Sequence, residues 1–171
     1  MRLTISFALA LLIWRPTVTI GQHAATPGST LPDFKLADLA GKPFRSSQLK
    51  GSVVVLDVWA TWCEPCIADI PMFNRLHDKY AGRGLKVVGI AVQSGWAKDV
   101  KPHVAKLGIK YLVLVGNDKV TGQYVDVGFP ITYLIGEDGK IIKKYTGTFP
   151  GRENGKEMDL EREMDRLLQP R

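Results

Sequence analysis

Two continuous apolar runs dominate the hydrophobic pattern of the chain and predict the centre of a sheet. Residues 53–59 (VVVLDVW) and 85–92 (LKVVGIAV) are rich in β-branched side chains and do not alternate regularly with polar ones. Such runs are typical of strands buried on both faces. Between them, apolar residues recur at helical spacing from Ile67 to Tyr80. This strand–helix–strand unit predicts a right-handed parallel crossover.

Weaker patterns on either side of this unit predict the remaining elements. In chain order they are a short hairpin (34–44), one helical turn (46–49), a helix and a short strand (98–107 and 111–115), one or two helical turns (119–125), a second hairpin (131–145) and a last helix (155–168). We expect Met158, Met164, Leu167 and Leu168 to share one face of the last helix. The mixture of strands and helices predicts an α/β domain.

The first residues have the pattern of an export signal. Arg2 precedes an almost unbroken apolar run, Leu3 to Trp14, of about 12 residues, whereas a membrane-spanning helix needs about 20. The alternatives are an uncleaved membrane anchor and an N-terminal core helix, although the run has no polar face. We therefore assign residues 1–25 to a signal peptide or membrane anchor and residues 26–171 to one domain.

Length and charge narrow the class of protein. The 171 residues are 45% apolar, which is enough for one well-packed domain. Arg2 and Arg15 belong to the leader; without them, 23 − 2 = 21 basic residues face 17 acidic ones, a net charge of +4. These charges are interspersed and form no basic stripe with interleaved aromatic residues. The pattern argues against a nucleic-acid partner.

Two cysteines, Cys63 and Cys66, directly follow the first buried strand and open the predicted helix. Pro65 is tolerated there because the first helical turn needs no internal N–H donor. The positive end of the helix favours a thiolate, the attacking form in disulfide exchange, so an exposed Cys63 is the expected nucleophile. Cys66, one turn deeper, would resolve the mixed disulfide. The charge of Glu64 suits the helix start but opposes a Cys63 thiolate, and so would tune the redox potential.

Other roles for two cysteines are weaker. A structural disulfide closing so short a loop would constrain the unfolded chain little. A zinc site needs about four ligands, and only the scattered His23, His77 and His103 could join the cysteines. We therefore expect no resident metal and no cofactor. A copper-handling role for paired thiols remains an open alternative.

The segment Trp59–Cys66 (WATWCEPC) resembles the W-C-x-x-C motif of the thioredoxin superfamily. The wider pattern resembles the TlpA/ResA branch of exported thioredoxin-like proteins over about residues 31–150. Its further elements are Pro32-Asp33-Phe34, the Gly41 turn, Leu49-Lys50-Gly51 and the segment 129–135 (FPITYLI). The resemblance implies a thioredoxin-like three-layer α/β/α fold. An N-terminal hairpin and an extra helix–strand insertion at about 94–115 would be added to it.

The same resemblance implies a thiol–disulfide oxidoreductase that exchanges disulfides with exported protein partners. It suggests a reductant in cytochrome c or oxidase assembly, supplied with electrons by a membrane-bound donor. The location would be periplasmic or otherwise extracytoplasmic, with or without an N-terminal membrane tether. A peroxiredoxin is the enzymatic rival, but that family places Pro seven and Thr or Ser three residues before its reactive Cys. Leu56 and Ala60 stand at those positions.

Two acids near the cysteines are candidate proton carriers. Asp57 interrupts an apolar strand, and burial there should raise its pKa. In thioredoxins, an acid at the matching position helps to move the proton of the buried cysteine; the alternative is a satisfied core polar group. Asp69 stands where TlpA/ResA-like proteins carry Glu. Its shorter side chain would either act on the thiols or be a solvated helix acid.

The resemblance also implies a partner-binding rim. The proline matching Pro130 is cis in this superfamily and faces the active-site disulfide, and the bulk of Phe129 beside it would alter the rim. Trp62 would offer an apolar surface to a partner, core packing being the alternative. We expect Trp59 and Trp96 to be ordinary packing residues.

Overall fold

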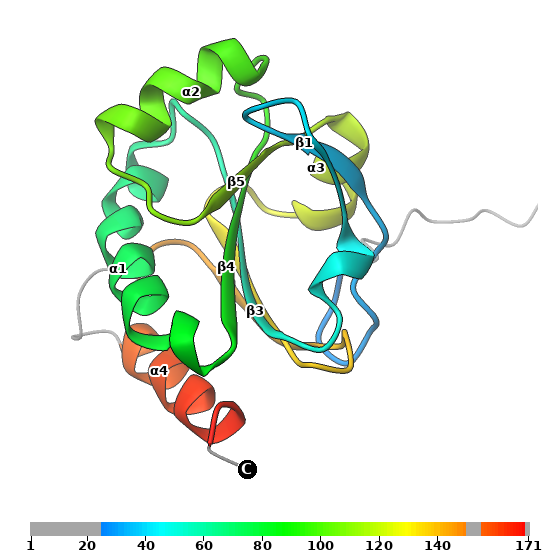
Figure 1. Cartoon of the computed structure of the whole chain (residues 1–171), viewed down its shortest axis with the longest axis vertical. Helices are drawn as coiled ribbons and strands as arrows, with labels where there is room; N and C mark the ends of the chain where they lie inside the picture. Colours follow the sequence, from blue (N-terminus) through cyan, green and yellow to red (C-terminus); the bar gives the residue numbers. More distant parts are fainter. Residues whose placement is uncertain (1–24, 150–154, 170–171) are drawn as a thin grey trace, which may run out of the picture.

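The computed structural model describes residues 25–149 and 155–169, which form a seven-stranded sheet with helices on both faces (Figure 1). The strands are β1 (Lys35–Asp38), β2 (Pro43–Arg45), β3 (Val53–Trp59), β4 (Leu85–Ala91), β5 (Leu112–Val115), β6 (Ile131–Ile135) and β7 (Ile141–Thr146). The helices are α1 (Glu64–Tyr80), α2 (Ala97–Lys106), α3 (Asp118–Tyr124) and α4 (Lys156–Leu167), with short 3-10 turns η1 (Ser46–Leu49) and η2 (Ala81–Arg83). The predicted elements are therefore confirmed within a few residues.

Strand β3 lies inside the sheet, whose order is β2-β1-β5-β4-β3-β6-β7. It pairs in parallel with β4 and antiparallel with β6, and all seven of its residues are buried. Helix α1 connects β3 to β4, as the strand–helix–strand pattern predicts. A parallel pair needs such a crossover, so the start of α1 is fixed at the carboxyl end of the buried strand.

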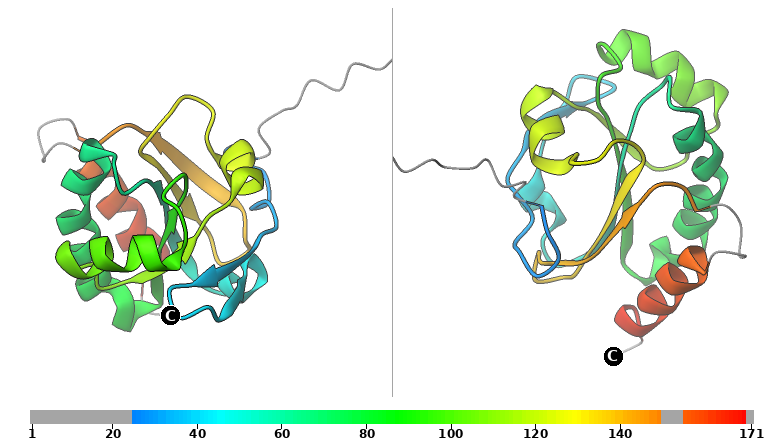
Figure 2. Two further views of the ribbon diagram at one scale, coloured as in Figure 1. Left: turned by 90° about the horizontal axis from the view of Figure 1, so that it is seen from above. Right: turned by 180° about the vertical axis from the view of Figure 1, so that it is seen from behind.

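The helices divide into two layers, confirming the three-layer fold (Figure 2). Alternate residues of β3 point to opposite faces, as the strand period requires. Val53, Val55 and Trp59 join the core formed with α1, α2 and α4, whereas Val54 and Val58 join the core formed with α3. The redox motif at the start of α1 thus belongs to the first layer.

The N-terminal hairpin and the helix–strand insertion lie side by side. β1 pairs with β2 and, antiparallel, with β5, where Ala37 is opposite Val115. Together they extend the sheet beyond β4, a placement that the sequence did not predict. Of the predicted leader, residues 1–25, only Ala25 is described, and it is buried. The assignment of residues 1–25 to a leader stays a prediction.

Helix α4 corrects one expectation. Leu160, Met164 and Leu168 are buried at four-residue spacing, whereas Met158 is exposed. A residue two positions away lies about 200° around a helix, so Met158 and Leu160 cannot share a face. No helix among residues 25–149 and 155–169 is long and apolar enough to span a membrane.

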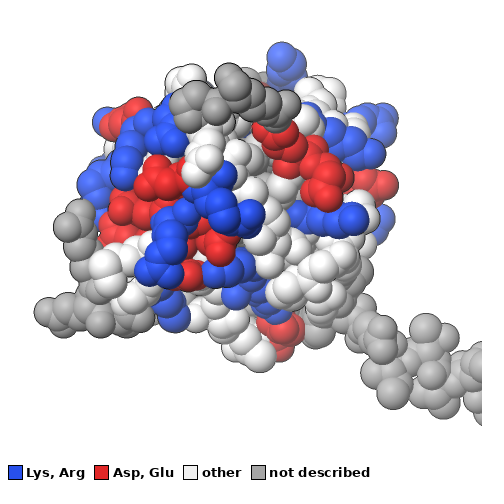
Figure 3. Space-filling view, turned by 90° about the horizontal axis from the view of Figure 1, so that it is seen from below, with Lys and Arg blue, Asp and Glu red and all other residues white. Residues whose placement is uncertain are grey.

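The charged side chains form mixed clusters on the face seen in Figure 3. Lys143 of β7 contacts both Asp159 and Glu163 of α4, at 2.8 and 3.1 Å. Arg75 of α1 pairs with Glu157 at 2.7 Å. These pairs join α4 to the edge strand β7 and to α1.

Candidate active site

The two cysteines form a disulfide at the start of α1. Cys63 is the N-cap of the helix, Glu64 and Pro65 occupy its first two positions, and Cys66 follows one turn on. The Cα atoms of the cysteines are 5.3 Å apart, and the amide of Cys66 donates to Cys63 Sγ at 3.2 Å. In the reduced protein this donor and the helix dipole would favour a Cys63 thiolate.

The accessibility of Cys63 differs from expectation. Its exposed fraction is 5%, against 1% for Cys66, so Cys63 is buried rather than exposed. The disulfide joins its sulfur to that of the more deeply buried Cys66. Glu64 and Pro65 are exposed beside it. Cys63 is still the more accessible of the two cysteines.

An aromatic rim borders the disulfide. The Phe129–Pro130 peptide bond is cis, as the resemblance implies, and Pro130 is buried. The rings of Phe129 and Trp62 meet edge to face with centroids 5.7 Å apart. Trp62 is 59% exposed, so the core-packing alternative for it is wrong. Sequence reasoning did not single out Val127, an exposed apolar residue of the loop before Pro130.

The loop after β4 holds the start of the motif in place. Trp62 Nε1 donates to the Gln93 carbonyl at 2.9 Å, and the amide of Thr61 donates to Ser94 Oγ, also at 2.9 Å. Gln93 adopts a φ of 49°, which few residues other than glycine adopt. The loop and the redox motif are therefore one hydrogen-bonded unit.

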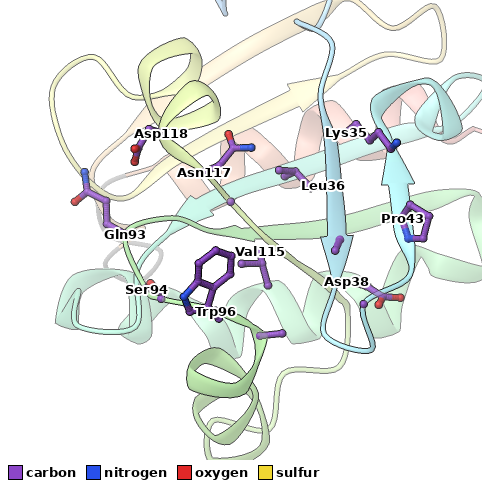
Figure 4. A pocket seen from close by; sticks show the side chains of 15 residues that line it. Lys35, Leu36, Asp38, Pro43, Gln93, Ser94, Trp96, Val115, Asn117 and Asp118 are labelled. Carbon is purple, nitrogen blue, oxygen red and sulfur yellow. The ribbon is translucent and has the colours of Figure 1, made fainter.

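A cavity of about 730 Å³ opens beside this loop (Figure 4). It lies between Trp96 on one side and Lys35 and Asp38 of the N-terminal hairpin on the other, with Val115 also in its lining. Trp96 is 73% exposed, so the expectation that it is an ordinary packing residue is wrong. The N-terminal hairpin on the other side of the cavity is far away in sequence. The local pattern around Trp96 therefore did not indicate a cavity.

Asp57 is buried with few hydrogen bonds to replace those it would make with water. Its exposed fraction is 1%; Thr132 Oγ1, from the residue opposite on β6, donates to Oδ1 at 3.5 Å, and Oδ2 has no hydrogen-bond partner. Burial raises the pKa of Asp57 well above its usual range, and the charge of Asp69 raises it further. The predicted direction of the shift is confirmed.

Asp69 is also buried, so the solvated-acid alternative is wrong. Its exposed fraction is 3%, and its Oδ1 accepts a 2.9 Å hydrogen bond from the Phe149 amide. Its Oδ2 has no hydrogen-bond partner. Burial raises the pKa of Asp69 to about 6; the Phe149 bond and Lys156 oppose this shift, and Glu157 adds to it.

Two further polar groups of this face were missed by sequence reasoning. Trp59 Nε1 and the Tyr111 hydroxyl are buried without a hydrogen-bond partner. Gly89 makes room for them, since a Cβ there would lie 3.0 Å from Trp59 Nε1 and 3.2 Å from Tyr111 Cε2. Gly89 is the feature of the sequence that could have indicated this cluster, because a glycine inside a buried strand often marks a close approach of other groups.

Within residues 25–149 and 155–169, no group of three or more His, Cys, Asp or Glu side chains is placed to hold a metal ion. His77 and His103 lie on different helices, α1 and α2. His23 lies outside the described residues. The chemistry available at the site is that of the paired sulfurs and the two buried acids.

Comparison with known proteins agrees with this chemistry. The Redoxin family matches residues 26–162. The chain is 35% identical over 133 residues to the thiol-disulfide oxidoreductase ResA of Bacillus subtilis, covering 77% of this chain and 73% of that protein. It is also 35% identical over 127 residues to ResA of Geobacillus thermodenitrificans, covering 73% and 72%.

A solved structure has the same architecture. The thiol:disulfide interchange protein DsbE from Chlorobium tepidum superposes with a TM-score of 0.76 at 28% identity. The match covers 85% of this chain and 99% of that one.

Proposed function

Because the chain belongs to the Redoxin family and is a thioredoxin-like thiol–disulfide oxidoreductase, we propose that Cys63 and Cys66 are its redox pair. The disulfide between them, at the start of α1, is the observation that carries this proposal; the ring of Phe129, which precedes the cis-proline, contacts Trp62 next to Cys63. Glu64 and Pro65, as the intervening residues, set the charge and the backbone geometry around Cys63.

The proposed reaction begins with the reduced protein. The Cys63 thiolate attacks one sulfur of a partner disulfide, the partner S–S bond breaks, and a mixed disulfide forms. Cys66 loses its proton and attacks Cys63 Sγ. The Cys63–Cys66 bond forms and the partner leaves as a dithiol after taking up two protons. Two electrons have passed from the protein to the partner, and the described structure corresponds to the oxidised product.

The partner is proposed to be an exported polypeptide that rests on Trp62, Phe129 and Pro130. The exposed indole and the neighbouring phenyl ring offer apolar surface beside Cys63. Trp62→Ala should raise KM several-fold for a disulfide-bonded peptide and leave the rate with a small disulfide unchanged. Met158→Ala is the matched control, because Met158 is also exposed but lies on α4. Equal effects on both substrates would contradict this role.

We further propose that the protein acts as a reductant outside the cytoplasm, in cytochrome c or oxidase assembly, with a membrane-bound thiol donor. The similarity to ResA and DsbE supports this proposal, as does the apolar run of the leader. A C-terminal reporter that is active only after export tests the location. An inactive reporter on a stable fusion would refute it.

The redox potential of the Cys63–Cys66 couple tests the direction of electron flow. We expect a value near about −270 mV, as for thioredoxin, whereas a value near about −120 mV would indicate an oxidant. Anaerobic copper titration of the reduced protein tests the copper-handling alternative. Tight stoichiometric binding, together with poor exchange activity, would favour that alternative.

A further inference from the structure

Helix α2 carries three lysines whose charge no acid of the described chain neutralises. Lys98, Lys101 and Lys106 are exposed, and within residues 25–149 and 155–169 their side chains form no ion pair and no hydrogen bond. The helix contains one acid, Asp99, whose Oδ2 accepts the Trp96 amide at 2.9 Å. Three lysines less one aspartate leave α2 with a formal charge of +2.

The lysines point away from the side of α2 that packs on the domain. Val100 is fully buried, and Val104 packs against the same core. At about 100° per residue, the three lysines lie about 100° or more around the helix from Val100. Lys98, Lys101 and Lys106 therefore form one outward surface, which we call the α2 basic face.

Helix α4 shows how this domain uses charges that serve the fold. Glu157 pairs with Arg75 at 2.7 Å, and Asp159 pairs with Lys143 at 2.8 Å. These pairs join α4 to its neighbours, whereas the lysines of the α2 basic face make no such contact. Their positive charge is directed to the solvent and is available to an anionic partner.

An exposed indole lies at the start of the same helix. Trp96 is the N-cap of α2 and is 73% exposed. Lysines together with an exposed tryptophan are typical of helices that lie on a membrane surface, where the ring enters the headgroup region and the ammonium groups meet lipid phosphates. A soluble acidic protein would match the lysines, but burial of the indole favours a surface that is anionic and has apolar material directly beneath.

The α2 basic face belongs to the end of the molecule that carries the redox motif. Strand β4 ends with Ala91 opposite Trp59, the last residue of β3. Helix α2 then lies across the end of the sheet from which α1 starts (Figure 1). The loop before α2 is bonded to the motif, since Ser94 Oγ accepts the Thr61 amide at 2.9 Å. A surface that holds α2 therefore keeps the disulfide close to it.

We propose that the α2 basic face and Trp96 dock the protein on an anionic membrane surface, with phospholipid headgroups as the ligands. Each lysine should favour anionic over neutral lipid by about fivefold, which multiplies to on the order of 10²-fold for the three. Docking holds the Cys63–Cys66 pair where it meets a membrane-bound partner. This consequence for exchange rests on the proposed redox role, whereas the docking itself does not.

Lysine footprinting of the full chain tests the docking. The protein is mixed with vesicles of phosphatidylglycerol or of phosphatidylcholine, its amines are acetylated briefly, and the labelled residues are identified by peptide mass mapping. We expect labelling of Lys98, Lys101 and Lys106 to slow several-fold on phosphatidylglycerol and not on phosphatidylcholine. Because salt screens exposed charges, the protection should disappear at about 1 M salt. Trp96→Ala should weaken it; an unchanged footprint would contradict the part of Trp96 in docking.

Three other lysines are the matched control within the same molecule. Lys50, Lys86 and Lys140 are also exposed, but they lie at the opposite end of the sheet, near the first residues of β3 and β4. Their labelling should be the same on both lipids. Attachment through the predicted leader would not distinguish the two groups of lysines in this way.

Two outcomes of the footprint would overturn the proposal. One is equal labelling of the α2 basic face on the two lipids. The other is protection by soluble polyglutamate but not by phosphatidylglycerol vesicles, which would indicate an acidic protein as the partner.

Reduction of a lipid-anchored disulfide peptide tests the consequence for exchange. The rate should be several-fold higher on phosphatidylglycerol than on phosphatidylcholine vesicles, and Lys98→Ala/Lys101→Ala/Lys106→Ala should lose this advantage. The corresponding triple variant of the control lysines should keep it. An advantage that persists in the α2 variant would overturn the docking. All three proteins should reduce a soluble peptide equally, since the redox motif is unaltered; failure of all three there would count against the redox pair instead.

Discussion

The two faces of β3 differ in how far their buried polar groups find hydrogen-bond partners, although Gln123 Oε1 of α3 also lacks one. On the α3 face, Tyr133 donates to the Tyr124 carbonyl at 2.5 Å, and Tyr124 donates to the Pro32 carbonyl. On the α1 face, the Tyr111 hydroxyl, Trp59 Nε1 and one oxygen of each buried acid have no hydrogen-bond partner. The same strand supplies both faces through alternate residues.

The difference teaches which polar groups serve the fold and which serve the chemistry. A hydroxyl that donates to a backbone carbonyl stabilises the fold, and its hydrogen bond is satisfied once the chain has folded. An acid with an unsatisfied oxygen costs stability and retains the capacity to take up or release a proton. Functional sites commonly depart from the packing rules that the rest of the fold obeys. Among the described residues most of these departures lie on the face that carries the disulfide, Gln123 Oε1 of α3 being the exception.

The largest expected effect is at the cysteines themselves. Cys63→Ser should reduce exchange to the uncatalysed rate, because the attacking thiolate is lost. Cys66→Ser should instead accumulate a mixed disulfide through Cys63. Alkylation of the reduced protein at mildly acidic pH, followed by peptide mapping, should label Cys63 first. Faster labelling of Cys66 would reverse the roles.

The next largest effect is on the pH dependence of stability. Burial raises the pKa of Asp69 from its ordinary 3.8 to about 6, so the folded chain binds more protons than the unfolded chain between these values. Stability should therefore fall as pH rises from about 4 to about 6. Asp69→Asn should flatten this fall while keeping an acceptor for Phe149. Denaturant titrations at several pH values measure it; an unchanged slope would contradict the assigned pKa.

A smaller effect on stability is expected on the α3 face, where the Tyr133 hydroxyl has a hydrogen-bond partner. Tyr133→Phe should lower the free energy of unfolding by about 1 kcal/mol, since the buried Tyr124 carbonyl loses its donor. Urea titration measures the loss, and exchange activity should be unaltered. A changed pH profile of exchange would show that the two faces are not independent.

The smallest effect is expected for Tyr111→Phe. Its hydroxyl has no hydrogen-bond partner, so its removal should leave the free energy of unfolding within about 0.5 kcal/mol of the original or raise it. Comparison with Tyr133→Phe in the same urea titrations separates the faces. A loss as large as that of Tyr133→Phe would mean that Tyr111 makes a stabilising hydrogen bond in solution.

The local pattern of apolar residues and the spacing of the cysteines determined the central elements of the fold and the chemistry of the site. The unbroken apolar runs predicted β3 and β4, and helical spacing predicted α1, because a strand or helix imposes its own period on the residues it buries. The spacing of Cys63 and Cys66 at the start of α1 predicted the disulfide chemistry. The resemblance carried by the motif added the cis bond at Pro130, which spacing alone does not favour.

Tertiary structure decided what depends on residues far apart in sequence. Asp69 is buried because Phe149, eighty residues later, places its amide against it. Tyr111 approaches Gly89 and Trp59 only because β5 packs beside β4. Trp96 borders a cavity because the N-terminal hairpin pairs with β5. A local period identifies which side of an element is buried, but only the packing of elements fixes which polar groups share that burial.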